Sequence, residues 1–538
     1  MDNQSQKKMF TLFLPLLEMI RVFERTAQLE LPPEDSRLKL NTVVSKISLF
    51  YEKLRNAIDY ADEHLLRERA VYRNLKRTMT VTNRSGQSIA KPLIYDLIRA
   101  GYLPNDQLHE NVISQAEVII DRYLTLNSYI GSYKAKGEKA AIFDLLLSML
   151  AIELDDLLVS KERDNALIEC MYQVVKKDIV VTDNLYSELD KKVQMYIAIL
   201  KSLMKADRAR ISLYLWVMYV PNWQRADKPE LLQIAQNISD LYTNVTRHLD
   251  HQLQNLYIRI LRKYNVLFLL IRDIIWEYPM QALDIWKQPQ LLEERIRQAA
   301  KKRYKTSRVK LTRSIIRSII YLFVTKMILA VLLEFPLDLM FEKSINYMTI
   351  AINVTFPPLL MFVIGLFIRV PGIKNTDKIA QGIKEISYQF EERNVIRKIK
   401  KPLKRSVLMT RAFKFVYAVI FLFTFSLIVY GLDLLGFNIA SMIIFIFFLC
   451  LVSFFSIRIS QSARELHILE KKDNILTFIT DFFSLPILEA GRWLSDKLNK
   501  INFFVVFFDF IIEAPFKVLI QGIDEWTGYV REKKEDIY

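Results

Sequence analysis

The chain has 538 residues, enough for two or three domains of ordinary size, and 51% of these residues are hydrophobic. It contains only 12 glycines and two cysteines, which argues against β-rich and glycine-loop nucleotide folds and excludes a disulfide framework or a cysteine-rich zinc module. The net charge of +16 is concentrated in residues 301–538, where the chain is also most apolar, so it indicates membrane topology rather than nucleic-acid binding.

Residues 1–305 are predicted to form a cytoplasmic α-helical domain, because apolar residues recur at helical spacing and good helix formers dominate. Two apolar runs, Ile211–Val220 and Val266–Trp276, are only about ten residues long, which is typical of buried core helices rather than membrane spans. Met9–Ile20 is expected to be an amphipathic helix. The other expected helices are Ser36–Met79, Ile89–Ala100, Leu108–Leu126, Ile142–Leu158, Leu185–Met204 and Leu231–Tyr278.

Four stretches in residues 306–460 are long and apolar enough to cross a hydrocarbon core, which needs about 20 residues of helix. Arg317 and Lys326 lie inside the first stretch, and Pro357 and Pro358 should kink or break the second. The last two stretches have uncharged cores. The four predicted spans are residues 314–335, 347–368, 413–434 and 439–457.

Basic residues are concentrated on one side of the predicted spans. A basic run precedes the first span, the loop 371–412 is basic, and Arg458 and Arg464 follow the fourth span. The two opposite loops contain a single basic residue, Lys343. The positive-inside rule therefore predicts that both termini are cytoplasmic. The expected location is a bacterial inner membrane or an equivalent plasma membrane.

The tail, residues 461–538, is predicted to contain amphipathic interfacial or re-entrant helices. Its apolar runs, within Ile475–Leu498 and Ile501–Val530, are about a dozen residues long and too short for an ordinary span. Each run ends near a proline and is followed by a tryptophan, a residue that favours the headgroup level. The alternative is a pair of helices packed on the cytoplasmic domain.

Lys326 lies twelve residues into the first predicted span, where a lysine usually faces protein or water and has a partner. Glu334 follows eight residues later, a rotation of about 80° on a continuous helix, so the two residues share a broad side. Together with Asp338 they are the candidate residues for an ion or solute path. The alternative is a structural lysine that is paired within the helix bundle.

The basic run before the first span has two interpretations. Its side chains are predicted to contact anionic lipid headgroups, because Lys and Arg beside a membrane helix are attracted to them. The alternative is simple anchoring by a basic flank. The candidate contact residues are Lys301, Lys302, Arg303, Lys305, Arg308, Lys310 and Arg313.

The sequence contains no nucleotide-binding, zinc-protease, hydrolase or calcium-loop motif, so no catalytic residue, metal site or cofactor is predicted. His248 and His251 are three residues apart on an expected helix and could hold two positions of a metal. Because no nearby pattern supplies further ligands, they are expected to be surface histidines.

An acidic cluster and one cysteine were the remaining candidates for chemistry. Glu153, Asp155 and Asp156 could ligate a cation, but a solvated helix face beside an apolar stripe is the preferred interpretation. Cys170 is expected to be a buried structural cysteine, because no basic neighbour stands close to it in sequence.

The sequence therefore predicts an all-α, multi-pass membrane protein with a large N-terminal cytoplasmic helical domain. The leading function hypothesis is a non-enzymatic membrane-anchored scaffold or adaptor whose helical domain binds a protein partner. The alternative is an ion channel or transporter that uses the charged residues of the first span, and it predicts a homo-oligomer because four helices make only a small pore. The predicted partners are a bilayer with anionic headgroups and a protein, without nucleic acid.

Overall fold

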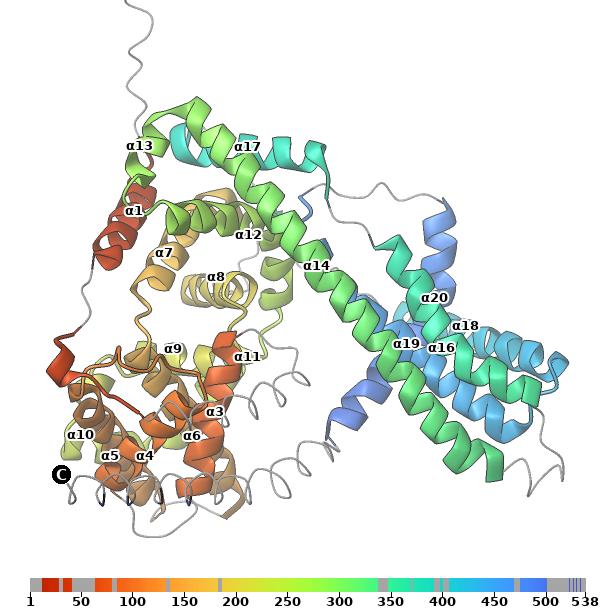
Figure 1. Cartoon of the computed structure of the whole chain (residues 1–538), viewed down its shortest axis with the longest axis horizontal. Helices are drawn as coiled ribbons and strands as arrows, with labels where there is room; N and C mark the ends of the chain where they lie inside the picture. The colour runs from red at the N-terminus through yellow and green to blue at the C-terminus, as the bar shows by residue number, and fades with distance from the viewer. Residues whose placement is uncertain are drawn as a thin grey trace, which may run out of the picture.

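In the computed structural model, the described part of the chain is almost entirely α-helical (Figure 1). The only strands among the described residues are β1 (Ile179–Val181) and β2 (Arg397–Ile399), so the predicted all-α fold class is confirmed. The structure describes residues 12–28, 32–40, 63–79, 85–131, 136–181, 186–336, 347–368, 371–390, 397–399, 406–468 and 475–500, and the single positions 522, 526, 529 and 533.

The N-terminal part consists of short and medium helices that end before residue 289. In chain order they are α1 (Leu14–Ala27), η1 (Glu34–Ser36), α3 (Glu63–Met79), α4 (Gly86–Arg99), α5 (Asn111–Gly131), α6 (Lys136–Leu158), α7 (Glu162–Asp178), α8 (Glu188–Leu203), α9 (Arg208–Tyr219), η2 (Trp223–Arg225), α10 (Lys228–Gln236), α11 (Ile238–Leu249), α12 (Leu253–Glu277) and α13 (Ala282–Lys287).

The two longest predicted helices were wrong in extent. In the predicted helix Ser36–Met79, Ser36 ends η1 and the described residues 37–40 are not helical, because Arg37 pairs with His109 as an isolated bridge. The next helix is described only from Glu63. Leu231–Tyr278 is three helices rather than one. The first break falls at Asn237, whose side-chain Nδ2 donates to the carbonyl of Gln233 and so competes with helix continuation.

Side-chain caps account for the starts of α9 and α10. The carboxylate of Asp207 accepts a hydrogen bond from the backbone N–H of Arg210 at 3.0 Å. Asp227 accepts from the backbone N–H of Glu230 at 2.9 Å, and the Glu230 carboxylate accepts from the backbone N–H of Asp227 at 3.2 Å. This reciprocal pair is a capping box, which satisfies two backbone donors at the helix start.

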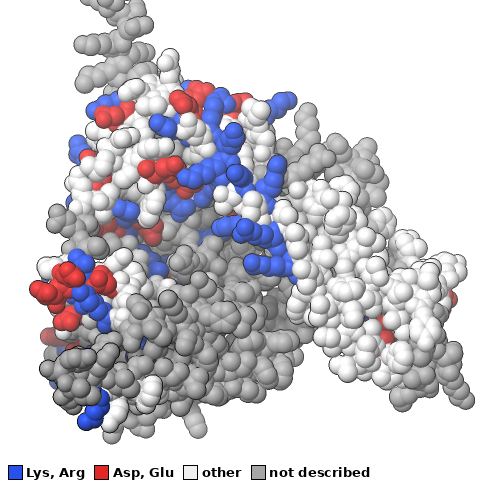
Figure 2. Space-filling view, in the orientation of Figure 1, with Lys and Arg blue, Asp and Glu red and all other residues white. Residues whose placement is uncertain are grey.

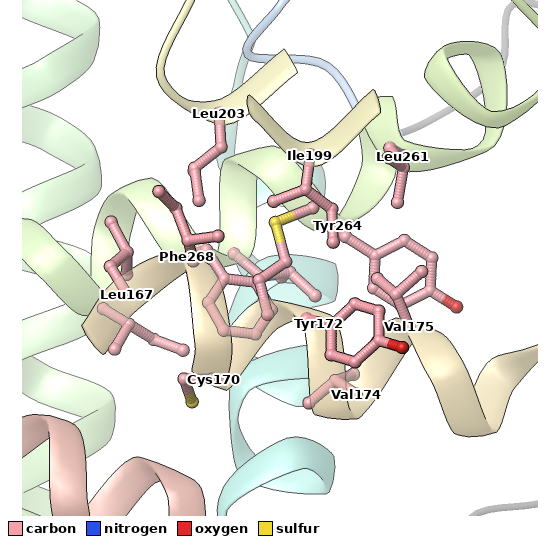
Figure 3. Close-up of a cluster of buried hydrophobic side chains, with 14 of the residues drawn as sticks. Leu167, Cys170, Tyr172, Val174, Val175, Ile199, Leu203, Leu261, Tyr264 and Phe268 are labelled. Atoms are coloured by element: carbon pink, nitrogen blue, oxygen red, sulfur yellow. The ribbon is translucent and has the colours of Figure 1, made fainter. Parts of the chain in front are cut away.

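Among its described residues, two hydrophobic cores hold the N-terminal part together. The first core joins α1, α7, α8, α11, α12 and α13, and Figure 3 shows the part where Phe268 of α12 packs among Leu167 and Cys170 of α7 and Ile199 of α8. The second core joins α3, α4, α5, α6 and α10. Helix α9 contributes Leu215 to the first core and Trp216 to the second. The prediction that Ile211–Val220 lies in a buried core helix is confirmed.

Helix α14 (Pro289–Leu329) connects this part to the apolar helices without a break (Figure 1). Its 41 residues span roughly 60 Å at about 1.5 Å per residue. The first half buries Leu292, Ile296 and Ala300 in the first core. The second half buries Leu322 against the apolar helices. One helix is therefore shared by both parts of the molecule.

Four helices among the described residues are long and apolar enough to cross a membrane. Each matches one of the predicted spans, and the first two predicted spans end one residue beyond the helix. Helix α16 continues through Pro357 and Pro358, so the expected break does not occur. The four helices are Pro289–Glu334, which comprises α14 and the π turn η3 (Ala330–Glu334), α16 (Tyr347–Phe367), α18 (Val407–Leu434) and the segment Ile439–Ile457 of α19 (Ile439–Arg464).

The connection between α16 and α18 is partly folded onto the N-terminal helices. Helix α17 (Ile373–Tyr388) buries Ile379 and Ile383 in the first core. Strand β2 pairs in parallel with β1, with Ile179 opposite Arg397. The segment predicted as a basic loop therefore contains a helix and a strand that bind the N-terminal part.

Candidate functional site

Lys326 and Glu334 form a buried ion pair in the first apolar helix. The Lys326 Nζ lies 2.6 Å from the Glu334 Oε1, and both side chains are 0% exposed. The structure thus brings together two of the three residues that the sequence selected for an ion path. The third, Asp338, lies outside the described residues.

The π turn at Ala330–Glu334 explains why the pair can form. On a continuous α-helix, residues eight apart are rotated by about 80° from each other. In a turn with i→i+5 hydrogen bonds each residue rotates the chain by roughly 80° instead of roughly 100°. The four steps from Ala330 to Glu334 therefore cancel the offset, and Glu334 lies on the same line along the helix as Lys326.

An aromatic ring lies beside the pair, and the apolar helices also bury the side chain of Asn353 in α16. The Lys326 ammonium lies 4.7 Å from the ring centre of Phe448 in α19, within range of a cation–π interaction. The Nδ2 of Asn353 in α16 donates to the carbonyl of Ser441 at 3.3 Å. The Glu334 Oε2 and the Asn353 Oδ1 find no hydrogen-bond donor within the described part of the chain.

The seven predicted lipid-contact residues all lie on α14, and two of them are paired with α12. Lys302 lies 3.1 Å from the Glu277 carboxylate, and Arg303 lies 3.3 Å from that of Asp273. Figure 2 shows Lys and Arg gathered over the middle of α14, between the mixed-charge N-terminal part and the almost uncharged apolar helices. The other five candidates are exposed: Lys301, Lys305, Arg308, Lys310 and Arg313.

Asn375, near the start of α17, connects three segments that adjoin the apolar helices. Its Nδ2 donates to the Tyr304 hydroxyl in α14 at 3.0 Å and to the carbonyl of Leu466, beyond α19, at 2.9 Å. Its Oδ1 accepts from the backbone N–H of Ile468 at 2.9 Å. Because Asn375 is buried, this single amide joins the segments before the first, between the second and third, and after the fourth apolar helix.

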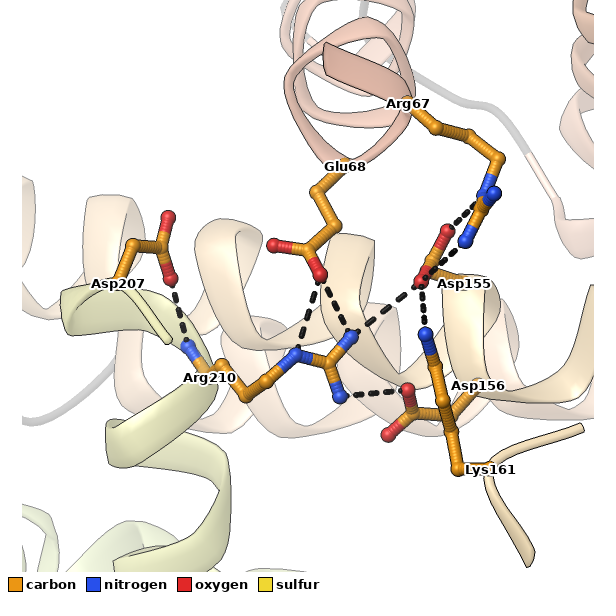
Figure 4. A network of polar contacts seen from close by, with 7 residues as sticks. All are labelled: Arg67, Glu68, Asp155, Asp156, Lys161, Asp207 and Arg210. Atoms are coloured by element: carbon orange, nitrogen blue, oxygen red, sulfur yellow. Dashed lines mark hydrogen bonds and ion pairs between the residues drawn. The ribbon is translucent and has the colours of Figure 1, made fainter. Parts of the chain in front are cut away.

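The acidic cluster of α6 is not the solvated face that was expected. Figure 4 shows that two of its members, Asp155 and Asp156, lie inside a network of ion pairs between α3, α6 and α9. The Asp155 carboxylate is 3.2 Å from Lys161 and 3.3 Å from Arg210, and it accepts a hydrogen bond from Arg67 at 3.2 Å. Asp156 lies 2.7 Å from Arg210. The prediction failed because α3 and α9 supply basic partners that are distant in sequence.

Burial and the neighbouring charges shift the pKa values of the carboxyl groups in this network. It opposes ionisation of Asp155, but the hydrogen bond from Arg67 and the charges of Lys161 and Arg210 hold the pKa of Asp155 below its usual value. Burial raises the pKa of Glu68 to about 7, although the carboxylate lies 2.7 Å from Arg210.

Glu153, the third member of the cluster, is also buried and fully engaged. Its carboxylate pairs with Arg122 at 3.0 Å and accepts hydrogen bonds from the Tyr123 hydroxyl at 2.8 Å and the Trp223 Nε1 at 2.9 Å. Among the described residues no group of three or more His, Cys, Asp or Glu could hold a metal ion. The cluster is therefore part of the scaffold of the N-terminal helices.

The two histidines do not form a site either. His248 is fully buried rather than on the surface, because α11 packs on α8 and α9. Its Nδ1 lies 3.2 Å from the Gln194 Nε2, and its Nε2 lies 2.7 Å from the Tyr219 hydroxyl. Burial lowers the pKa of His248. Cys170 is buried in the first core, as predicted, and burial raises the pKa of its thiol.

Sequence reasoning missed Asn375, because an isolated asparagine in a basic connection gives no pattern that marks it. It also missed the π turn, since no residue in Ala330–Glu334 distinguishes it from an α-helix. Two features bear on function: the buried Lys326–Glu334 pair, and the three hydrogen bonds of Asn375, which we call the Asn375 junction. Comparisons with protein-family models, with curated proteins and with solved structures found no match for this chain, so its function is inferred from its own geometry.

Proposed function

We propose that this chain is a multi-pass membrane protein that acts as a membrane-anchored scaffold or adaptor. In this proposal α14, α16, α18 and α19 cross the bilayer, both termini are cytoplasmic, and the N-terminal helical domain binds a protein partner. The membrane is a bacterial inner membrane or an equivalent plasma membrane.

The Asn375 junction supports the two-hairpin topology. Tyr304 precedes the first apolar helix, Asn375 lies between the second and third, and Leu466 follows the fourth. Segments joined by direct hydrogen bonds lie on the same side of a bilayer. Each pair of apolar helices would then cross and return, as the distribution of basic residues also indicates.

The observation that carries the scaffold proposal is the continuity of α14. A single helix packs in the first core of the N-terminal part and continues among the apolar helices, so the N-terminal domain is held in a fixed orientation. The exposed basic residues in its middle would lie at the headgroup level and attract anionic lipids. A rigid, charge-balanced helical surface held at a membrane is suited to presenting a binding face.

An exposed aromatic residue offers a place to test partner binding. Trp276, at the end of α12, is 60% exposed, and the guanidinium of Arg163 lies 4.6 Å from the centre of a ring of Trp276. Trp and Arg are enriched among residues that dominate binding energy at protein interfaces. Met280, four residues later in the chain, is also half exposed.

The test is chemical crosslinking of the full chain in its native membrane, followed by identification of the crosslinked proteins. A reproducible partner is expected for the wild type and for Leu189→Ala, a control at an exposed apolar residue of α8. The partner should be lost with Trp276→Ala. Absence of any crosslinked protein from chains shown to be folded and membrane-inserted would contradict the scaffold proposal.

Transport is the second candidate, and the ion pair in the apolar helices favours it. Ionisable residues inside a membrane are costly and commonly mark an ion pathway. The Glu334 Oε2, which accepts no hydrogen bond from the described residues, would add an acceptor to such a path. Flux through the protein in liposomes that Lys326→Leu abolishes or alters would establish transport, and no flux with any common ion would exclude it.

A further inference from the structure

Helix α20 (Ile475–Lys500) follows the last apolar helix, and its packing indicates where it lies. It packs along α19 and also contacts α18. The expected alternative, packing on the N-terminal helices, is not observed in the described part of α20. Helix α20 is not one of the four helices that are apolar enough to cross a membrane.

The contact between α20 and α19 is almost backbone to backbone. A Cβ at Gly491 would collide with the carbonyl oxygen of Cys450 and lie 2.9 Å from the Cβ of Phe454. Ser495, one turn further along α20, is also buried. Small residues at such close contacts are typical of helix pairs in lipid, where packing rather than the hydrophobic effect drives association.

These contacts fall inside the apolar stretches of α18 and α19. Cys450 is eight residues from Arg458, or roughly 12 Å along the helix at about 1.5 Å per residue. The ring of Phe483 lies 6.3 Å from that of Phe423, nine residues into α18 from Lys414. A hydrocarbon core is about 30 Å thick, so each contact lies within its cytoplasmic half if α18 and α19 cross.

The rest of the α20 surface suits the same depth. Three large apolar side chains, Phe482, Phe483 and Leu485, are exposed on its N-terminal half. On its C-terminal half Glu489 accepts a hydrogen bond from Tyr417 of α18, and the exposed Trp493 lies near Lys497. Apolar side chains followed by Trp and charged residues are typical of a helix that rises from acyl chains to headgroups.

We infer that α20 is embedded in the cytoplasmic leaflet without crossing the bilayer, and that its exposed apolar face contacts lipid acyl chains. This inference rests on the proposed membrane topology. It assigns the bilayer, rather than a protein partner, as the occupant of this face. The lipid-exposed surface of α18 continues directly beside α20, because Phe423 and Phe483 are neighbours.

The test places a spin label at Leu485→Cys in the full chain in liposomes and measures collisions with oxygen, which partitions into lipid, and with a water-soluble nickel chelate. Two exposed apolar residues serve as matched controls: Leu427 of α18 for lipid and Val118 of α5 for water. The native Cys170 and Cys450 are buried, and the unsubstituted protein gives the background labelling.

The inference predicts that a label at position 485 collides often with oxygen and rarely with the nickel chelate, as a label at Leu427 does. A label at Val118 should instead collide often with the nickel chelate. A nickel-accessible label at Leu485 with an oxygen-accessible label at Leu427 would overturn the inference and leave the membrane topology standing. A label at Leu485 that neither reagent reaches would indicate a protein on this face and would also overturn it. A nickel-accessible label at Leu427 would overturn the topology itself.

Discussion

Removing one or both members of the buried ion pair tests whether the pair is structural. Lys326→Leu leaves the Glu334 carboxylate buried without its cation, and Glu334→Leu leaves the ammonium without its anion. Because both side chains are fully buried, each single change is expected to cost about 3–5 kcal/mol of unfolding free energy. The double variant leaves an apolar interior beside Phe448 and should lie within about 1 kcal/mol of the wild type, or be more stable.

The assay is denaturant unfolding of the purified protein in mixed micelles, with the four proteins compared in one double-mutant cycle. Lys310→Leu, at an exposed basic residue of the same helix, is the control and should change stability by less than about 0.5 kcal/mol. If both single variants are as stable as the wild type, water reaches the remaining charge. That result would refute the structural interpretation and strengthen the transport candidate.

Three further predictions concern the junction and the N-terminal helices. Asn375→Ala removes three hydrogen bonds and should destabilise the protein by roughly 2–4 kcal/mol in thermal unfolding. The control Asn222→Ala, at an exposed asparagine, should have little effect. Equal effects of the two changes would contradict a stabilising role for the Asn375 hydrogen bonds. Burial lowers the pKa of His248 from its ordinary 6.5, so below that pH the unfolded chain binds more protons and the free energy of unfolding should fall. His248→Gln should reduce this fall. An unchanged dependence of stability on pH in the variant would show that His248 does not cause it. Burial raises the pKa of Glu68 from 4.5 to about 7, so the folded protein binds this proton more tightly than the unfolded chain does. The stability that the protonated Glu68 contributes should be present below pH 4.5 and lost as the pH rises through 7. Glu68→Gln should remove this loss of stability, and a loss that persists in the variant would assign it to another group.

The helices and their apolar lengths could be predicted from the sequence because they depend on local properties. Hydrophobic spacing and the scarcity of glycine indicated an all-α chain, and long, mostly apolar runs marked the four long apolar helices. Burial of Cys170 and of the run Ile211–Val220 also followed from composition over a few residues. Helix limits were less accurate, as in Leu231–Tyr278, because a single side chain such as that of Asn237, which donates to the carbonyl of Gln233, accompanies the break.

The sequence alone determined that the chain is basic, that its charge is uneven, and that four apolar helices follow a helical N-terminal part. These features depend only on the composition of runs of neighbouring residues. Only the tertiary structure decided which charges meet. Asp155 pairs with Arg67, which is 88 residues away in the sequence, and Asn375 bonds to Tyr304, which is 71 residues away. The π turn aligns Lys326 with Glu334. Such contacts depend on how helices pack, and no local pattern encodes the position of a partner that another helix supplies.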